Sequence, residues 1–187
     1  MKNKTKLAVF DLDGTLFDTD LVNCCSYQKA AEECGYFLEK EKFLQVFTGK
    51  NYREFLPLFG IVDAGVQEKI HEKKKRYYAE FLPQAKKNQH LFSMIRELRG
   101  GYMIALATTA SKRNAMELLA CFGETETFDF FITQEDVRKL KPDPECYLMA
   151  MEKAGVAACD TIIFEDSEVG MMAARASGAY AFLVDHF

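Results

Sequence analysis

Five short apolar runs constrain the fold of this chain more than any other feature of its sequence. Each run has the length of a β-strand, and segments with helical spacing precede the last three of them. Short strands that alternate with helices favour a parallel sheet with helices on both faces. We therefore predict an α/β fold built on a doubly wound, Rossmann-like parallel sheet. The runs lie at residues 7–10, 103–107, 130–132, 161–164 and 179–184, and the helical segments at residues 111–122, 144–154 and 168–177.

The stretch between the first two runs has a different character. Residues 20–98 contain no convincing strand, but several segments there have the apolar spacing of a helix. This is too much helix for one crossover between two strands, so we predict an inserted all-helical domain. The segment 89–101 ends in Gly-Gly before the second run and is assigned to the core. The expected boundaries are residues 1–17 and 84–187 for the core and residues 18–83 for the insertion.

Charge and hydropathy exclude several classes of partner. The chain of 187 residues has a formal net charge of -4 and a pI near 5.5, whereas nucleic-acid or acidic-membrane binding normally needs a basic surplus. It contains no apolar run of about 18 residues, and its first apolar run is too short for a signal peptide. We expect a cytoplasmic protein that binds a small molecule, and neither nucleic acid nor a membrane. A monomer is expected, with a dimer as the alternative.

Cysteine and histidine show no metal-binding pattern. None of the six cysteines has the C-x-x-C spacing of a zinc or redox site, and the three histidines lack ligand-like neighbours at i+3 or i+4. We therefore expect reduced cysteines and no histidine-based metal site.

Polar side chains follow four of the apolar runs. They are Asp11 and Asp13 after the first run, Thr108 and Thr109 after the second, Lys141 after the third, and Glu165 and Asp166 after the fourth. In an open parallel sheet, ligands bind beyond the carboxyl ends of the strands. Four carboxylates gathered there would repel one another, and one lysine does not balance them. A divalent cation is required, and an all-oxygen ligand set suits Mg²⁺, which also bridges to phosphate. The sequence therefore predicts a magnesium-dependent phosphate pocket.

These residues resemble the four motifs of the haloacid dehalogenase-like superfamily, in the same order. The motifs are "DLDGT" at residues 11–15, Thr108, Lys141 and "ED" at residues 165–166, and the helical insertion resembles the helical cap of that superfamily. The stretches "FEDSEVGMMAARASGA" and "KLKPDPECY" are similar to those of its beta-phosphoglucomutase and sugar-phosphate phosphatase branch. The Pro-Gly that commonly marks the return from cap to core is missing in "LPQAKKNQ".

The resemblance implies a role for each acid. Asp11 would attack phosphorus as an ionised carboxylate and form an aspartyl-phosphate. Asp13 would protonate the leaving oxygen and then deprotonate the incoming water. Magnesium would be bound by Asp11, the backbone carbonyl of Asp13 and Asp166. Glu165 would bind it directly or through water.

The remaining motif residues would contact the phosphate. Gly14 would let the backbone turn close to it, and Thr15 and Thr108 would offer hydroxyl groups. Lys141 would neutralise charge on the transferring phosphoryl group. Thr109 is a further candidate for binding substrate, while Ser111 is expected either to cap the following helix or to join the site.

Three features of the insertion carry further expectations. Arg53, after Gly49 in "TGKNYREF", resembles a substrate-binding arginine of the phosphoglucomutase branch. Asn23 stands where those mutases have a histidine that gates the proton-transferring aspartate, and it is assigned to substrate binding. The run "EKKKR" at residues 72–76 is expected to be a solvated helix face, with a substrate clamp as the alternative.

The leading functional hypothesis is a magnesium-dependent phosphatase that hydrolyses a small, sugar-phosphate-like metabolite. The alternative within enzymes is a phosphomutase, which returns the phosphoryl group to a sugar. An alternative of another class is a non-catalytic binding module on the same fold. Carbon–halogen hydrolysis is disfavoured because it needs neither the metal nor an acid at Asp13.

Overall fold

The computed structural model describes residues 5–47 and 50–184, and the chain divides into two compact units. The core unit comprises Met1–Asp18 and Lys86–Phe187, and the inserted unit comprises Thr19–Ala85. Gly49, named above beside Arg53, lies outside the described residues. Each unit is described by itself.

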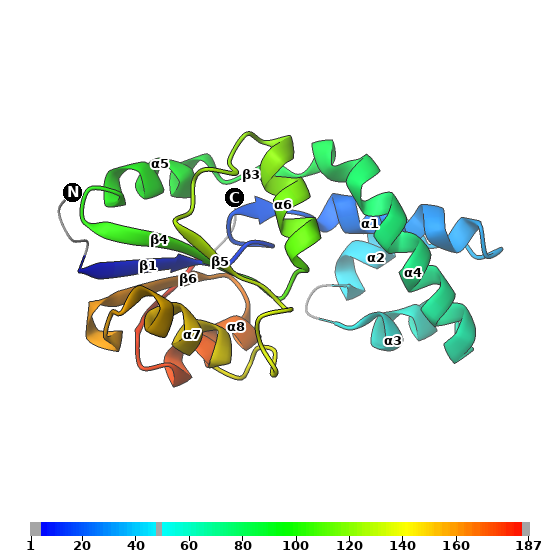
Figure 1. The fold of residues 1–187 in the computed structure, drawn as a ribbon. Coiled ribbons are helices and arrows are strands. Elements are labelled where there is room, and N and C mark those ends of the chain that lie inside the picture. The colour runs from blue at the N-terminus through cyan, green and yellow to red at the C-terminus, as the bar shows by residue number, and fades with distance from the viewer. Residues whose placement is uncertain (1–4, 48–49, 185–187) are drawn as a thin grey trace. The chain divides into compact units, whose positions relative to one another are not determined.

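The core unit is built on a five-stranded sheet whose pairs are all parallel (Figure 1). Its order is β5-β4-β1-β6-β7, so the first strand in sequence lies in the centre. Leu7 of β1 is in register with Met103 of β4 on one side and with Thr161 of β6 on the other. The predicted α/β parallel sheet is confirmed. The strands are β1 (Lys6–Phe10), β4 (Tyr102–Ala107), β5 (Phe130–Ile132), β6 (Thr161–Glu165) and β7 (Tyr180–Leu183).

Helices cover both faces of this sheet. Figure 1 shows α5 and α6 on one face and α7 and α8 on the other. Helix α7 packs on β1, β4 and β5, and α5 packs on β4. Ser111 caps α6, since its side chain accepts a hydrogen bond from the backbone N–H of Asn114, which is the first of the two roles considered for it. The helices are α5 (Gln89–Leu98), α6 (Lys112–Cys121), α7 (Glu145–Ala154) and α8 (Glu168–Ala176), with a 3₁₀ turn, η3, at Ala158–Asp160.

The central strand is apolar because both of its faces are covered. Four of the five residues of β1 are buried, from Leu7 to Phe10. The ring of Phe10 stacks on that of Phe164 in β6, with centroids 4.6 Å apart. On the α7 side, Val9 belongs to an apolar cluster with Tyr147 and Met151. This rigid packing fixes the position at which β1 ends and the aspartates begin.

A pair of two-residue strands corrects one expectation. We expected no strand between residues 20 and 98, but β3 (Lys86–Lys87) pairs antiparallel with β2 (Phe17–Asp18). These strands lie on either side of the inserted segment in the chain, and the Nζ of Lys86 lies 3.4 Å from an oxygen of Asp18. Strands this short have no alternating pattern, so the periodicity of side chains does not reveal them.

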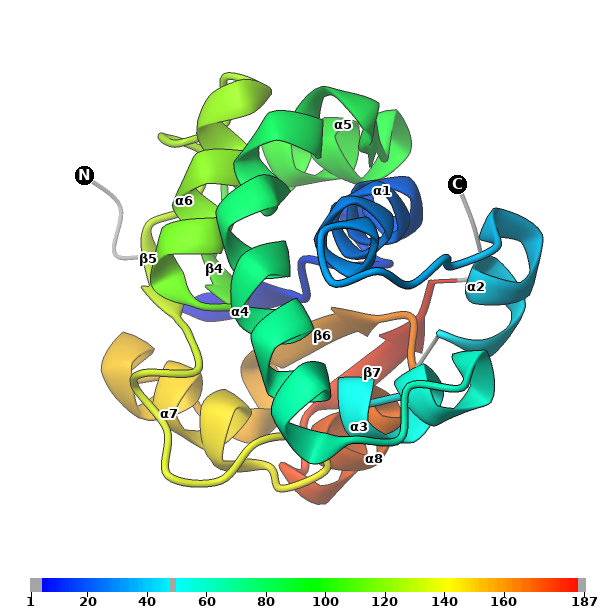
Figure 2. The same cartoon turned by 90° about the vertical axis from the view of Figure 1, so that its right-hand side faces the viewer.

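The inserted unit is helical around an aromatic core. Helices α1 and α4 pack together most extensively (Figure 2). The ring of Tyr27 lies edge-on to that of Phe55, and its hydroxyl oxygen lies 2.8 Å from Nδ1 of His71. Burial lowers the pKa of His71 to about 4, so this ring is neutral near pH 7. The elements are α1 (Asp20–Glu32), α2 (Lys40–Val46), α3 (Tyr52–Phe55), η1 (Leu56–Phe59), α4 (Ala64–Phe81) and η2 (Leu82–Gln84).

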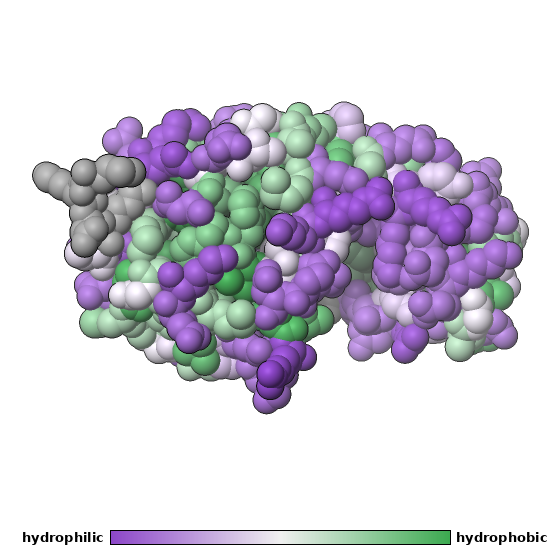
Figure 3. Space-filling model, viewed as in Figure 1, coloured by the Kyte–Doolittle hydropathy of each residue, from purple (hydrophilic) through white to green (hydrophobic). Residues whose placement is uncertain are grey.

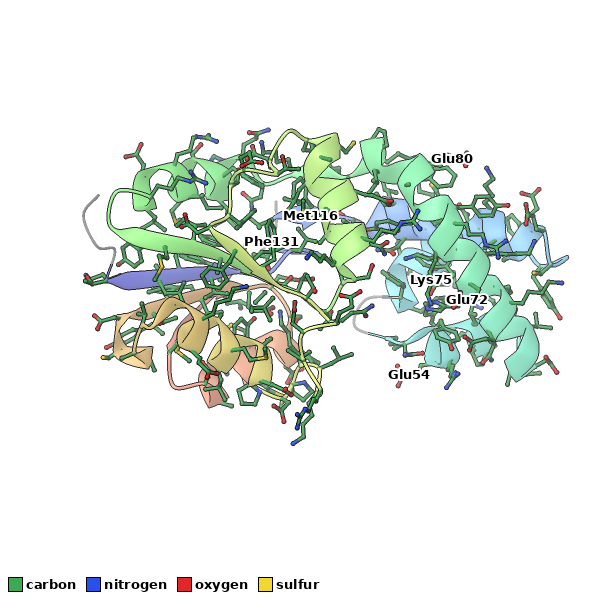
Figure 4. All side chains as sticks on the ribbon, viewed as in Figure 1. Glu54, Glu72, Lys75, Glu80, Met116 and Phe131 are labelled. Carbon is green, nitrogen blue, oxygen red and sulfur yellow. The ribbon has the colours of Figure 1, made fainter. Side chains whose placement is uncertain are left out.

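The charged run on α4 is mostly the solvated face that its composition predicts, with one exception. Hydrophilic residues dominate the face of the inserted unit in Figure 3, and Figure 4 shows Lys75 beside Glu72, its ion-pair partner at 2.6 Å. Lys74 instead is buried, with its ammonium over the rings of Tyr27 and Tyr78. A buried aliphatic stem with cation–π contacts explains how a lysine fits there. No helix in the described part of the chain has the length and apolar character needed to cross a membrane.

Candidate active site

Asp11 begins the site at the carboxyl end of the central strand. Its backbone N–H donates to the carbonyl of Phe164, 3.0 Å away, which continues the pairing of β1 with β6. The Asp11 side chain is buried, with 6% of the residue exposed. The sheet therefore holds this carboxylate rigidly, inside the protein rather than in bulk water.

Lys141 joins the ends of three strands. Its ammonium donates to Oδ1 of Asp11 at 2.6 Å, to a carboxylate oxygen of Glu165 and to the backbone carbonyl of Ala107 at 3.1 Å. These acceptors follow or end β1, β6 and β4 respectively. Only 5% of the lysine side chain is exposed. The cation therefore lies within the acidic cluster, as its position after the third run predicts.

Asp166 lies beside the loop that follows β1. The hydroxyl of Thr15 donates to Oδ1 of Asp166 at 2.8 Å. Gly14 has a φ of 87°, and a Cβ there would lie 2.1 Å from Oδ2 of Asp166. Only glycine fits both the left-handed backbone and the close approach of this carboxylate.

Asp13 lies in the tight loop between Asp11 and β2. The N–H groups of Leu16 and Phe17 both donate to the carbonyl of Leu12 at 3.0 Å, and Asp13 forms an isolated bridge with Phe17. The Asp13 side chain is partly buried. Asp13 therefore lies in a compact turn, two residues after Asp11 in the chain.

The two threonines after β4 differ in exposure. Thr108 is buried, and its N–H donates to the carbonyl of Ile132 in β5 at 3.0 Å. Its hydroxyl oxygen accepts from the N–H of Ala110 at 3.0 Å. Thr108 directly follows Ala107, whose carbonyl accepts a hydrogen bond from the ammonium of Lys141. Thr109, in contrast, is exposed.

Three carboxylates form a group that fits a divalent cation. One oxygen from each of Asp11, Glu165 and Asp166 lies within 4.8 Å of the others. Lys141 is the cation hydrogen-bonded to this group, so the negative charge exceeds the positive charge if all three acids are ionised. Oxygen donors of this kind suit Mg²⁺. The donor set thus fits the metal that the sequence predicts.

Burial sets the electrostatics of these groups. Burial raises the pKa of Asp11 well above its usual range, opposed by Lys141 and reinforced by Glu165 and Asp166. Burial also raises the pKa of Asp166. For Lys141, burial lowers the pKa, but the surrounding groups, Asp11 first, outweigh it and raise the pKa well above its usual value. Lys141 is therefore a permanent cation, and a bound divalent cation would act with it to keep Asp11 ionised.

Sequence reasoning missed three residues that contact this group. The hydroxyl of Tyr147 in α7 donates to Glu165 at 2.6 Å, and both the N–H and the hydroxyl of Ser167 lie near the other oxygen of Glu165. A Cβ on Gly170 in α8 would lie 2.0 Å from the carboxyl carbon of Glu165. The signal available for Tyr147 was a hydroxyl-bearing residue in the first turn of the helix after Lys141. No comparable signal marks Gly170.

The two candidates in the insertion make contacts within their own unit. The side-chain amide of Asn23 in α1 donates to the carbonyl of Thr19 at 3.1 Å. The guanidinium of Arg53 in α3 pairs with Glu68 at 3.0 Å and is largely exposed. Their assignment to substrate binding therefore stays a prediction.

Comparison with known proteins gives the family. A model of the haloacid dehalogenase-like hydrolases matches residues 8–184. The chain belongs to this family. The phosphorylated carbohydrates phosphatase of Thermotoga maritima is 31% identical to it over 176 residues, covering 91% of this chain and 80% of that protein. The resemblance inferred from the motifs is confirmed.

Solved structures of other proteins share the fold. CbbY from Rhodobacter sphaeroides, in complex with phosphate, aligns with a TM-score of 0.81 at 24% identity, covering 98% of this chain and 87% of that one. Beta-phosphoglucomutase from Clostridium difficile aligns with a TM-score of 0.75 at 21% identity, covering 94% and 82%. Both likenesses extend over most of each chain, so these proteins share the fold.

The position of Asp166 yields a first prediction. Asp166→Asn should raise the magnesium concentration for half-maximal activity by roughly tenfold or more, because the role predicted for Asp166 is that of a charged ligand in a site with few protein carboxylates. The measurement is phosphate release against magnesium concentration, with Asp160→Asn, an exposed acid in η3, as the matched control. Unchanged activity of Asp166→Asn at sub-millimolar magnesium would show that this acid is structural.

Proposed function

We propose that this protein is a magnesium-dependent phosphatase that hydrolyses a small, sugar-phosphate-like metabolite through an aspartyl-phosphate on Asp11. The observation that carries the proposal is the buried contact between Asp11 and Lys141, set beside two further carboxylates, Glu165 and Asp166, at the end of the neighbouring strand β6. A binding module has no need to bury a nucleophile against a fixed cation. The phosphorylated carbohydrates phosphatase among the relatives supports the substrate class.

Magnesium would be held by Asp11, by the backbone carbonyl of Asp13 and by Asp166, with Glu165 in the same acidic group. When bound, it would neutralise phosphate oxygens and help to orient the phosphorus toward the nucleophile. The hydroxyls of Thr15 and Thr108 remain candidates for contacts to the phosphate, as does the exposed Thr109.

The reaction assigned to these side chains has two balanced steps. A carboxylate oxygen of Asp11 forms a bond to phosphorus while the bond from phosphorus to the leaving oxygen breaks, and Asp13 gives that oxygen its proton. Water then attacks phosphorus, Asp13 takes a proton from it, and the bond to Asp11 breaks. Inorganic phosphate leaves and both aspartates return to their starting states. Lys141 stabilises the charge on the phosphoryl oxygens in both steps.

A direct assay tests the proposal against the non-catalytic alternative. The protein should release phosphate from p-nitrophenyl phosphate in the presence of magnesium, and chelation of the metal should abolish that release. A panel of phosphorylated metabolites then identifies the substrate. Absence of metal-dependent release from every compound would favour the binding module.

Asn23 distinguishes hydrolysis from phosphomutase activity. An asparagine forms hydrogen bonds but carries no titrating proton, so it cannot act as the histidine gate expected of a mutase. We predict that beta-glucose 1-phosphate, supplied with a bisphosphate primer, yields inorganic phosphate and little glucose 6-phosphate. Faster accumulation of glucose 6-phosphate than of free phosphate would establish the mutase instead.

The acid role of Asp13 is tested by changing the leaving group. Asp13→Asn should lose steady-state turnover of both aryl and alkyl phosphates, because the second step needs the base. The first step should be partly retained for an aryl phosphate, since an aryl oxide leaves with little protonation. Rapid-quench measurement of the released alcohol in the first turnover checks this. Equal first-turnover loss for both substrates would contradict the acid role.

The proposal also covers the cellular location and the oligomeric state of the protein. An acidic chain with a small-molecule substrate is proposed to act in the cytoplasm as a monomer, with a dimer as the alternative. Light scattering of the purified chain measures the oligomeric state directly.

A further inference from the structure

Glu165 is distinguished from the other acids by the number of donors around it. The residue is 1% exposed. Its Oε1 accepts from the ammonium of Lys141 and from the hydroxyl of Tyr147, and its Oε2 lies 3.3 Å from the hydroxyl oxygen and 3.4 Å from the backbone nitrogen of Ser167. A carboxylate offers about four lone-pair sites. Hydrogen-bond donors of the protein therefore already use the lone-pair sites of the Glu165 carboxylate.

The helix after Glu165 restricts its movement. A Cβ on Gly170 would lie 2.0 to 2.1 Å from the carboxyl atoms of Glu165, so the carboxylate lies directly against the backbone of α8. Asp166 also lies close to a glycine backbone, that of Gly14, but the Thr15 hydroxyl donates to its Oδ1, whereas Glu165 accepts hydrogen bonds at both of its oxygens. Glu165 is thus held in place by donors at both of its oxygens.

Tyr147 contacts both members of the Lys141–Glu165 pair. It is fully buried in α7, and its ring centroid lies 5.1 Å from the Nζ of Lys141. Burial raises the pKa of its hydroxyl well above the usual range, so the group stays protonated and donates to Glu165. A cation–π contact and a shared hydrogen-bond acceptor restrict the lysine from two sides.

We propose that Glu165 and Tyr147 are positioning residues that direct the Lys141 ammonium toward Asp11, and that Glu165 is not a magnesium ligand. This inference rests on the proposed function and revises the metal assignment made from the "ED" motif. Asp11 and Asp166 then supply the carboxylate ligands. Glu165 acts on the reaction through Lys141, whose 2.6 Å contact with the nucleophile requires an ammonium held in one place.

Metal binding separates a ligand from a positioning residue without any turnover. Mn²⁺ is titrated into the full-length protein, and the free ion is measured by electron paramagnetic resonance. Glu165→Gln and Tyr147→Phe should bind Mn²⁺ within about twofold of wild type, whereas Asp166→Asn should bind it roughly tenfold or more weakly. Weakening by Glu165→Gln to the level of Asp166→Asn would overturn the proposal.

Kinetics at saturating magnesium test the positioning role. Glu165→Gln and Tyr147→Phe should each lower kcat by about 10- to 100-fold, since small displacements of a catalytic group have effects of that size, with little change in KM. Tyr180→Phe, at an exposed tyrosine of β7, is the matched control and should match wild type. A kcat for Tyr147→Phe equal to that of this control would contradict the role of Tyr147.

The double variant tests whether the two residues act as one unit. Glu165→Gln combined with Tyr147→Phe should lower kcat no more than the worse single variant, because both changes release the same lysine. Fully additive losses would refute a shared role. Tyr147→Phe keeps the shape of the side chain, so it remains informative if Glu165→Gln does not fold. If wild type releases no phosphate, the proposed function fails, while the Mn²⁺ titration still decides the assignment of Glu165.

Discussion

Asp11→Asn is expected to reduce metal-dependent phosphate release to below a few per cent of wild type, a loss of at least about 2 kcal/mol of transition-state stabilisation. An amide is neither a competent nucleophile toward phosphorus nor a good magnesium ligand, so both functions assigned to Asp11 are lost together. The amide has nearly the same shape, and Lys141 keeps Glu165 and the carbonyl of Ala107 as acceptors. The fold should therefore persist.

Two measurements make this result interpretable. Thermal unfolding of Asp11→Asn shows whether the loss reflects chemistry or folding, and Asp160→Asn controls for the loss of an acid elsewhere in the core unit. Residual turnover well above a few per cent in a folded Asp11→Asn protein would mean that another group attacks phosphorus.

Lys141→Met is expected to have the second large effect, lowering kcat by about 10²- to 10³-fold because it removes a preorganised charge from a buried site. The substitution also removes the ammonium that donates to Asp11 and Glu165. Lys139→Met, at an exposed residue paired with Asp143, is the matched control. Turnover of Lys141→Met near that of the control would contradict the assignment of Lys141.

The stability of Lys141→Met should depend on pH in a defined direction. The pKa of Asp11 is already raised in the folded protein, and loss of Lys141 removes the strongest opposing influence. A carboxyl group whose pKa is higher in the folded state than in the unfolded state favours folding at low pH and disfavours it as the pH rises through the folded pKa. Relative to wild type, the variant should therefore lose stability as the pH rises above the usual carboxylate range. Unfolding midpoints measured at several pH values in the absence of metal test this, and parallel profiles for the two proteins would contradict it.

The sheet could be predicted because its strands are buried on both faces. Such strands appear as continuous apolar runs, and the run at residues 130–132 coincides with β5. Helix α6 was equally visible, because residues 111–122 have the apolar spacing of a helix. Strands β2 and β3 were not visible, since two residues that pair through their backbone carry no side-chain pattern. The burial of Lys74 depends on the rings of Tyr27 and Tyr78, which only the packing of α1 against α4 brings to it.

The part of the site that lies at the ends of the strands could be predicted from the topology of the sheet. Parallel strands carry Asp11, Lys141 and Asp166 to one edge, because each follows the end of a strand or the loop after it. The contacts of Tyr147 and Gly170 with Glu165 depend on how α7 and α8 pack against the sheet, and no local pattern encodes that distance. The motif therefore predicted that the acids gather, but not which of them is already saturated by donors.

The central claim is that the phosphoryl group passes through Asp11, and the covalent intermediate tests it most directly. Wild-type protein and Asp11→Asn are mixed with magnesium and a substrate they bind, quenched in acid during turnover and digested, and the peptides are analysed by mass spectrometry. We predict phosphate on Asp11 of the wild-type peptide that spans residues 7–29, and none on the same peptide from Asp11→Asn. Phosphate bound to a different residue in the wild-type protein during rapid turnover would contradict the account.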